Sequence, residues 1–172
     1  MITQFEGKVP RIHARAWVAP TAVVLGDVEI AEDASIWYLC VLRGDTNFIS
    51  IGARSNIQDG TIIHVNAGRE PAIIGSDVTV GHRAIIHACT LEDGAFVGMG
   101  ATVLDGAVIE GGAMLAAGSV LPPGKRMPRG ELWMGNPAKF VRVLTAEAQA
   151  QFAHTAPHYV ELSKRHKKIA KN

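Results

Sequence analysis

The chain has 172 residues, a formal net charge of +1 at pH 7 and 48% hydrophobic residues, which is typical of a single domain. The near-neutral charge gives no reason to expect a nucleic-acid partner, and no stretch is long and apolar enough to predict a membrane span. The N-terminus lacks the apolar segment of a signal peptide, and Cys40 and Cys89 form no C-x-x-C motif. These features favour a protein of the reducing cytoplasm.

An aliphatic residue recurs every six positions through most of the chain. Period six matches neither a helix nor an exposed strand, but it is typical of a hexapeptide solenoid. A small residue usually stands four positions after each aliphatic one, where it suits a crowded corner. A β-sandwich is the alternative, but sandwiches do not hold a fixed period for so long. We therefore predict a β-helix over residues 10–121 of a single domain (1–172), with these inward side chains: Ile12, Val18, Val24, Ile30, Ile36, Leu42, Ile51, Ile57, Ile63, Ile74, Val80, Ile86, Leu91, Val97, Val103, Ile109, Leu115 and Leu121.

Two departures from the period predict other structure. The step from Ile63 to Ile74 spans eleven residues, so a loop is expected near 66–71. Four prolines interrupt residues 122–137, which predicts a connecting loop over 122–144.

The segment 145–171 is predicted to be helical, because hydrophobic residues recur there at spacings of three and four. Thr145 is suited to cap it, and Pro157 is expected to kink or divide it. The basic end suits a helix C-terminus better than a nucleic-acid tail; its residues are Lys164, Arg165, Lys167, Lys168 and Lys171.

Two histidines occupy equivalent positions in the repeat. His64 follows the inward Ile63, and His87 follows the inward Ile86. Three hexapeptide steps, or one coil, separate them, so they are predicted to stack about 4.8 Å apart in backbone. Two imidazoles at this spacing can share a metal ion, and three histidines form the ligand set of an open, catalytic zinc site.

His82 is the third candidate ligand, but it stands two positions after the inward Val80, near a corner. We expect it to point away from His64 and His87 of its own chain. A threefold homotrimer would bring it to the histidine pair of a neighbour. The alternative is that the three histidines are exposed and solvated.

Polar residues gather on the coils before His64. Arg43 and Asp59 are predicted to form a buried bidentate ion pair, and Gln58, one position after an inward residue like His64, can hold a water. Arg43 can also orient a small anion or carbonyl group. A purely structural role at a subunit interface is the alternative for the set, which comprises Arg43, Asp45, Asn56, Gln58 and Asp59.

The run R-G-D-T-N-F-I-S-I-G-A-R-S-N-I-Q-D-G-T-I-I-H-V, followed by V-T-V-G-H-R-A-I-I-H-A-C-T-L, resembles the γ-class carbonic anhydrase family. The resemblance covers nearly the whole chain. It implies a left-handed parallel β-helix with a C-terminal helix, assembled as a homotrimer that reversibly hydrates CO2 to bicarbonate. It also implies Zn²⁺, with Fe²⁺ or Co²⁺ as other possible metals.

The resemblance further assigns the site residues. The metal would be held by His64 and His87 of one chain and His82 of the next, and its bound hydroxide would attack CO2. Arg43, Asp45, Asn56, Gln58 and Asp59 match the family's polar active-site residues, and Tyr159 resembles a helix tyrosine near the metal.

The chain departs from the best-characterised branch of that family at its proton-shuttle positions. Thr46 stands where that branch has an acidic residue, and the loop after His64 is short, with Glu70 as its acid. These departures predict weak CO2 hydration. They leave open two other functions. One is a CoA-linked acyltransferase or thioesterase, and the other is a non-catalytic, metal-stabilised trimer that binds an anion or organises a partner complex. The G-N-P-A-K segment (135–139) does not discriminate between the carbonic anhydrase and the acyltransferase.

Overall fold

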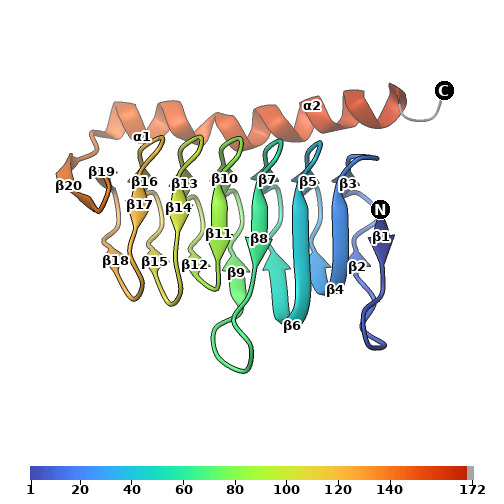
Figure 1. Cartoon of the computed structure of the whole chain (residues 1–172). Coiled ribbons are helices and arrows are strands. Elements are labelled where there is room, and N and C mark those ends of the chain that lie inside the picture. The colour runs from blue at the N-terminus through green and yellow to red at the C-terminus, as the bar shows by residue number, and fades with distance from the viewer. Residues whose placement is uncertain (170–172) are drawn as a thin grey trace.

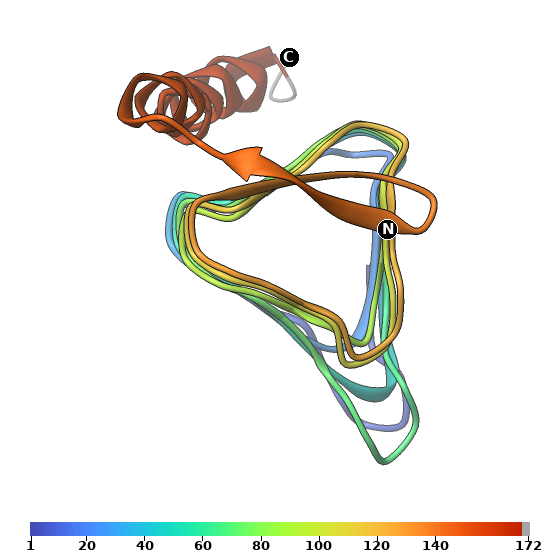
Figure 2. The same cartoon turned by 90° about the vertical axis from the view of Figure 1, so that its left-hand side faces the viewer.

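The computed structural model describes residues 1–169. The chain winds into a left-handed parallel β-helix of about seven turns, with a helical segment along one side (Figure 1). Seen along its axis, the β-helix is a triangular prism whose coils superpose closely (Figure 2). The predicted fold class is confirmed.

Short strands stack into the three faces of the prism. The first face contains β3 (Trp17–Val18), β5 (Ser35–Ile36), β7 (Asn56–Ile57), β10 (Thr79–Val80), β13 (Phe96–Val97) and β16 (Met114–Leu115). The second contains β1 (Ile2–Thr3), β8 (Ile62–His64), β11 (Ile85–His87), β14 (Thr102–Val103) and β17 (Val120–Leu121). The third contains β2 (Arg11–Ile12), β9 (Ala72–Ile74), β12 (Thr90–Leu91), β15 (Val108–Ile109) and β18 (Arg126–Met127). The longer β4 (Val23–Ile30) and β6 (Val41–Ile51) pair with strands of both the second and the third face.

The period-six residues form the core because parallel pairing keeps equivalent positions in register. On the second face Leu42, Ile63, Ile86 and Val103 pair in succession, and all four are fully buried. Coils approach so closely at one corner that a Cβ on Gly52 would lie 2.4 Å from the backbone of Gly75. The core is therefore one continuous column of aliphatic side chains.

The region predicted as a loop, 122–144, is largely strand, and that prediction is wrong. The period continues to β18, where Met127 pairs with Ile109 and is fully buried. The chain then forms β19 (Glu131–Gly135), which extends the first face, and β20 (Ala138–Val143), which pairs antiparallel with β19. The prolines lie outside the paired residues, at corners and in the turn between β19 and β20, where they remove no ladder hydrogen bond.

The C-terminal segment forms two helices, α1 (Ala146–Ala153) and α2 (Thr155–Ile169). The Thr145 hydroxyl accepts a hydrogen bond from the Ala148 N–H at 3.3 Å, so the predicted cap is confirmed. The helix divides at His154, with Pro157 in the first turn of α2, as predicted. The end of the predicted range 145–171, including Lys171, lies outside the described residues.

Helix α2 packs on the first face near the N-terminal coils (Figure 1). Trp17, Trp37 and Tyr38 surround His166, whose Nδ1 lies 2.8 Å from the Tyr38 hydroxyl oxygen. Lys167 donates to the carbonyl oxygen of Ala14 at 3.0 Å. Across residues 1–169, no helix is long and apolar enough to cross a membrane.

The Cys40 thiol is expected to be inert in the folded protein. Its side chain is fully buried at a small-residue position of the repeat, four positions after Ile36, and this burial raises the pKa of the thiol to about 12. Because the thiolate is the reactive form, iodoacetamide at pH 8 should leave Cys40 unmodified in native protein and alkylate it in urea. Mass spectrometry of the Cys40 peptide measures this; rapid native alkylation would contradict it.

Candidate functional site

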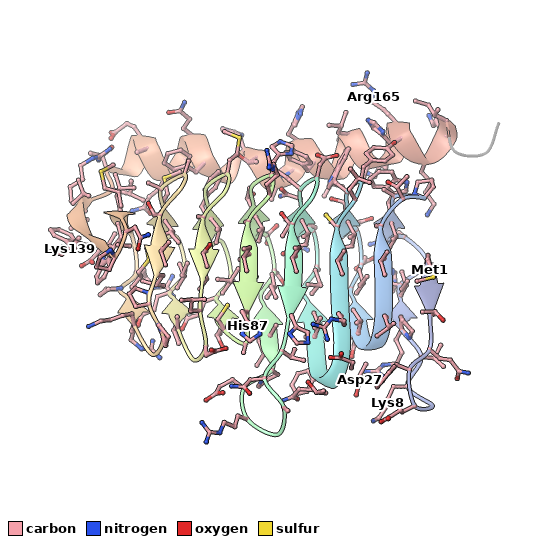
Figure 3. The ribbon with its side chains drawn as sticks, in the orientation of Figure 1. Met1, Lys8, Asp27, His87, Lys139 and Arg165 are labelled. Atoms are coloured by element: carbon pink, nitrogen blue, oxygen red, sulfur yellow. The ribbon has the colours of Figure 1, made fainter. Side chains whose placement is uncertain are left out.

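His64 and His87 lie side by side on the second face, at the ends of β8 and β11. They pair directly in the parallel register, as predicted. His64 Nδ1 lies 3.2 Å from His87 Nε2, and the ring centroids are 5.2 Å apart. Figure 3 shows His87 toward the lower edge of the central coils, on the side from which the loop between β8 and β9 projects. One nitrogen of each imidazole is therefore directed at its partner.

The other nitrogen of each imidazole contacts a carboxylate. His64 Nε2 lies 3.0 Å from Asp45 Oδ1, and the second oxygen of Asp45 accepts a hydrogen bond from Arg43. His87 Nδ1 forms a short hydrogen bond with Asp105 Oδ1. Four side chains from successive coils thus form a row: Asp45, His64, His87 and Asp105.

Asp45 is held in its charged form. Burial opposes its ionisation, but hydrogen bonds from His64 and Arg43 outweigh burial and lower the pKa of the carboxyl below its ordinary value. The ionised carboxylate favours an N–H on the His64 nitrogen that faces it, which leaves Nδ1 available as a ligand.

The histidine pair suits a metal such as zinc. Zn–N bonds of about 2.0–2.1 Å at a tetrahedral angle place two ligand nitrogens roughly 3.3 Å apart, close to the observed 3.2 Å. Among residues 1–169, however, no three His, Cys, Asp or Glu side chains of one chain are arranged to hold a metal ion. The histidine pair of a single chain therefore offers two nitrogens to a metal ion.

The remaining predicted residues gather at the corner between the first and second faces. His82 Nδ1 lies 2.9 Å from Asp59 Oδ2. Gln58 Nε2 donates to Asn56 Oδ1 at 3.0 Å, and Asn56 Nδ2 donates to the Thr79 hydroxyl at 2.9 Å. In this corner group of Asn56, Gln58, Asp59 and His82, the side chains of Asn56 and Gln58 are buried with their amides hydrogen-bonded.

Tyr159 of α2 belongs to the same corner. Its ring packs edge-on against Trp37, with centroids 5.1 Å apart. Burial, with a smaller contribution from the charge of Asp59, raises the pKa of the Tyr159 hydroxyl. Tyr159 is therefore a neutral group near Asp59.

Within one chain, the corner group lies apart from the pair of His64 and His87. Five positions separate His82 from His87, and an extended strand of that length spans up to about 16 Å. His82 lies at the opposite end of the face from the histidine pair, as its position in the repeat predicts.

One interpretation of the polar residues is wrong within the chain. Arg43 pairs with Asp45 rather than Asp59, because its backbone is in register with His64 while Asp59 lies at the other corner. Its side chain is 48% exposed, so this pair is not buried. Gln58, like His64, directly follows an inward residue, but it is 5% exposed and its amide is turned toward Asn56.

Asp105 was not among the predicted site residues. The signal was present, because three hexapeptide steps lead from Ile86 to Val103 and place the next coil directly on His87. The corner after β14 then brings Asp105 beside the imidazole.

Comparisons with known proteins were made by sequence and by structure. No family model matches the chain. Gamma carbonic anhydrase 2, mitochondrial, of Arabidopsis thaliana is 52% identical over 92% of this chain, which spans 59% of that relative's length. A carbonic anhydrase of Geobacillus kaustophilus is 44% identical over 98% of this chain and 92% of its own length.

A solved structure has the same fold over nearly its whole length. The hexapeptide transferase family protein from Anaplasma phagocytophilum superposes with a TM-score of 0.91 at 47% identity, covering 95% of this chain and 96% of its own. The similarity to the Geobacillus protein runs over nearly the full length of both chains and includes the histidine-bearing coils. The chain therefore belongs to the γ-class carbonic anhydrase family.

Proposed function

We propose that the protein is a metal-dependent enzyme that reversibly hydrates CO2 to bicarbonate at sites between the subunits of a homotrimer. The stacked pair of His64 and His87, each with one nitrogen turned to its partner and the other on a carboxylate, carries the proposal. His82 of the adjacent subunit completes each ligand set. Zinc suits these three imidazoles best, and Fe²⁺ or Co²⁺ also accept them.

Assembly of the site requires the second face to meet another copy. Ile62 and Ile85, the outward neighbours of the histidine pair on β8 and β11, are 45% and 43% exposed in the single chain. Their burial between subunits would stabilise the trimer. Cyclic symmetry then repeats the same contact at each interface, where it joins the corner group of one chain to the histidine pair of the next.

The chain's own residues would bind and orient the reactants. The bound metal would supply Lewis-acid chemistry that ionises water near neutral pH. Arg43, held by Asp45 and half exposed, would attract bicarbonate and orient it through its guanidinium. Gln58, fixed by Asn56, would orient the reacting water by hydrogen bonding, while Asp59 holds His82 and Tyr159 closes the corner.

A CoA-linked acyltransferase is the second candidate, because a close structural relative is described as a hexapeptide transferase family protein. The paired histidines favour the metalloenzyme, since an acyltransferase does not require two imidazoles backed by carboxylates. A third candidate is a metal-stabilised trimer without turnover.

Metal analysis and stopped-flow CO2 hydration on the same purified sample test the proposal. We expect one zinc per chain and hydration above the buffer rate, both lost in His64→Ala. His158→Ala, an exposed histidine on α2, is the matched control and should change neither. Protein without metal would favour the acyltransferase, and full metal without hydration would favour the non-catalytic trimer.

A further inference from the structure

We propose that Asp105 is a positioning residue for His87. Its carboxylate accepts the Nδ1–H of the imidazole, which fixes the tautomer and ring orientation that direct Nε2 toward His64. The metal-binding part of this inference rests on the proposed function; the tautomer part depends only on the chain.

The backbone around Asp105 is fixed from both sides. The Asp105 carbonyl oxygen accepts the Gly124 N–H at 2.8 Å from the following coil. The next residue, Gly106, donates its N–H to the Ala88 carbonyl oxygen at 2.7 Å, and Ala88 directly follows His87. The carboxylate and the imidazole therefore sit on two coils that are locked together, and the contact needs little rearrangement to form.

Asp105 also completes a pattern across the candidate ligands. His64 has Asp45 within 3.0 Å of one ring nitrogen, and His82 has Asp59 within 2.9 Å. With Asp105 on His87, each of the three histidines is backed by its own aspartate. A carboxylate in this position orients a ligand imidazole and raises its basicity, and its loss typically weakens metal binding about 10–100-fold.

Two substitutions separate positioning from general stability. Asp105→Ala removes the acceptor and should raise the zinc Kd about 10–100-fold. Asp105→Asn keeps an oxygen acceptor and should lose less affinity. Asp77→Asn is the matched control: Asp77 is a corner aspartate in a bidentate pair with Arg54, remote from the histidines, and its zinc Kd should stay unchanged. Competition titration with a chromophoric chelator measures the three values.

A second readout uses metal-free protein. Two-dimensional ¹⁵N–¹H spectra of the imidazoles should show His87 carrying its proton on Nδ1 in the wild type and in Asp105→Asn, but losing that preference in Asp105→Ala. An unchanged tautomer together with an unchanged zinc Kd in Asp105→Ala would overturn the proposal.

If the wild type binds no zinc, the proposed function fails, and the tautomer result alone decides the role of Asp105. If Asp105→Ala does not fold, Asp105→Asn decides the question. A zinc Kd of Asp105→Asn above that of Asp77→Asn, with the His87 proton still on Nδ1, supports the positioning role. A zinc Kd of Asp105→Asn equal to that of the wild type overturns it.

Discussion

Replacing His82 with alanine is expected to empty every metal site of the assembly. In a cyclic trimer each chain gives its His82 to one neighbour, so the substitution removes one ligand from all three interfaces. Zinc should fall from one per chain toward zero, and the trimer should dissociate more readily, because metal binding is coupled to assembly. Elemental analysis and sedimentation velocity on His82→Ala, with His158→Ala as control, measure both effects. Full metal occupancy in His82→Ala would show that the assignment is wrong.

Subunit mixing sharpens this test. A His64→Ala chain keeps His82, and a His82→Ala chain keeps the histidine pair, so neither variant alone can form a complete site. In a mixed trimer, one of the three interfaces joins intact His82 to an intact pair. Co-refolding the two variants should therefore restore up to one zinc per mixed trimer. No recovery in trimers confirmed to be mixed would contradict an interface shared between chains.

CO2 hydration is expected to be slow and to depend on buffer. A proton must leave the site in every cycle, and the acids closest to the histidine pair, Asp45 and Asp105, are already hydrogen-bonded to the imidazoles. Thr46 is exposed beside Asp45 but carries no carboxylate, while Glu70 of the loop contacts Asn66. Loss of efficient proton transfer typically costs about 10²–10⁴-fold in rate. The kcat of this protein should therefore be lower by about this factor than that of an enzyme with an acidic proton-transfer group at the site.

A gain-of-function variant tests that explanation. Thr46→Glu introduces a carboxylate next to the site and should raise kcat at low buffer concentration, whereas Thr46→Gln, of similar size, should not. Stopped-flow hydration of zinc- and iron-loaded protein across a series of buffer concentrations measures the effect. Fast, buffer-independent turnover by the wild type would mean that another group already exports the proton.

The β-helix and the stacked histidines could be predicted because both depend on local spacing. Once parallel strands repeat every six residues, one inward position such as Ile63 fixes the direction of its neighbour His64, and counting three steps locates His87. The ion pairs could not be predicted in this way. Arg43 pairs with Asp45 because β6 turns the corner between the second and third faces at these residues. This turn falls where the six-residue period is interrupted, so the period does not describe it.

The end of the β-helix differs from the prediction for a related reason. Prolines in a sequence indicate a loop, yet corners between short strands accept proline without losing a paired N–H. Met127 stands six positions after Leu121, so the period itself reaches it, and in the structure it pairs with Ile109. The count that pairs the histidines reaches Leu104 one coil later, and the corner after β14 brings the next residue, Asp105, to His87.

The path of the C-terminal helices has a consequence for how the molecule unfolds. A solenoid is held together by contacts between adjacent coils, so its ends can open one repeat at a time. Here α1 and α2 run from the last coil back to the first, where Lys167 bonds to the carbonyl of Ala14, 153 positions earlier in the chain. Peeling away the N-terminal coils therefore also requires release of α2. This fastening joins an otherwise linear array into a closed unit, so its terminal coils should share the hydrogen-exchange protection of the central ones.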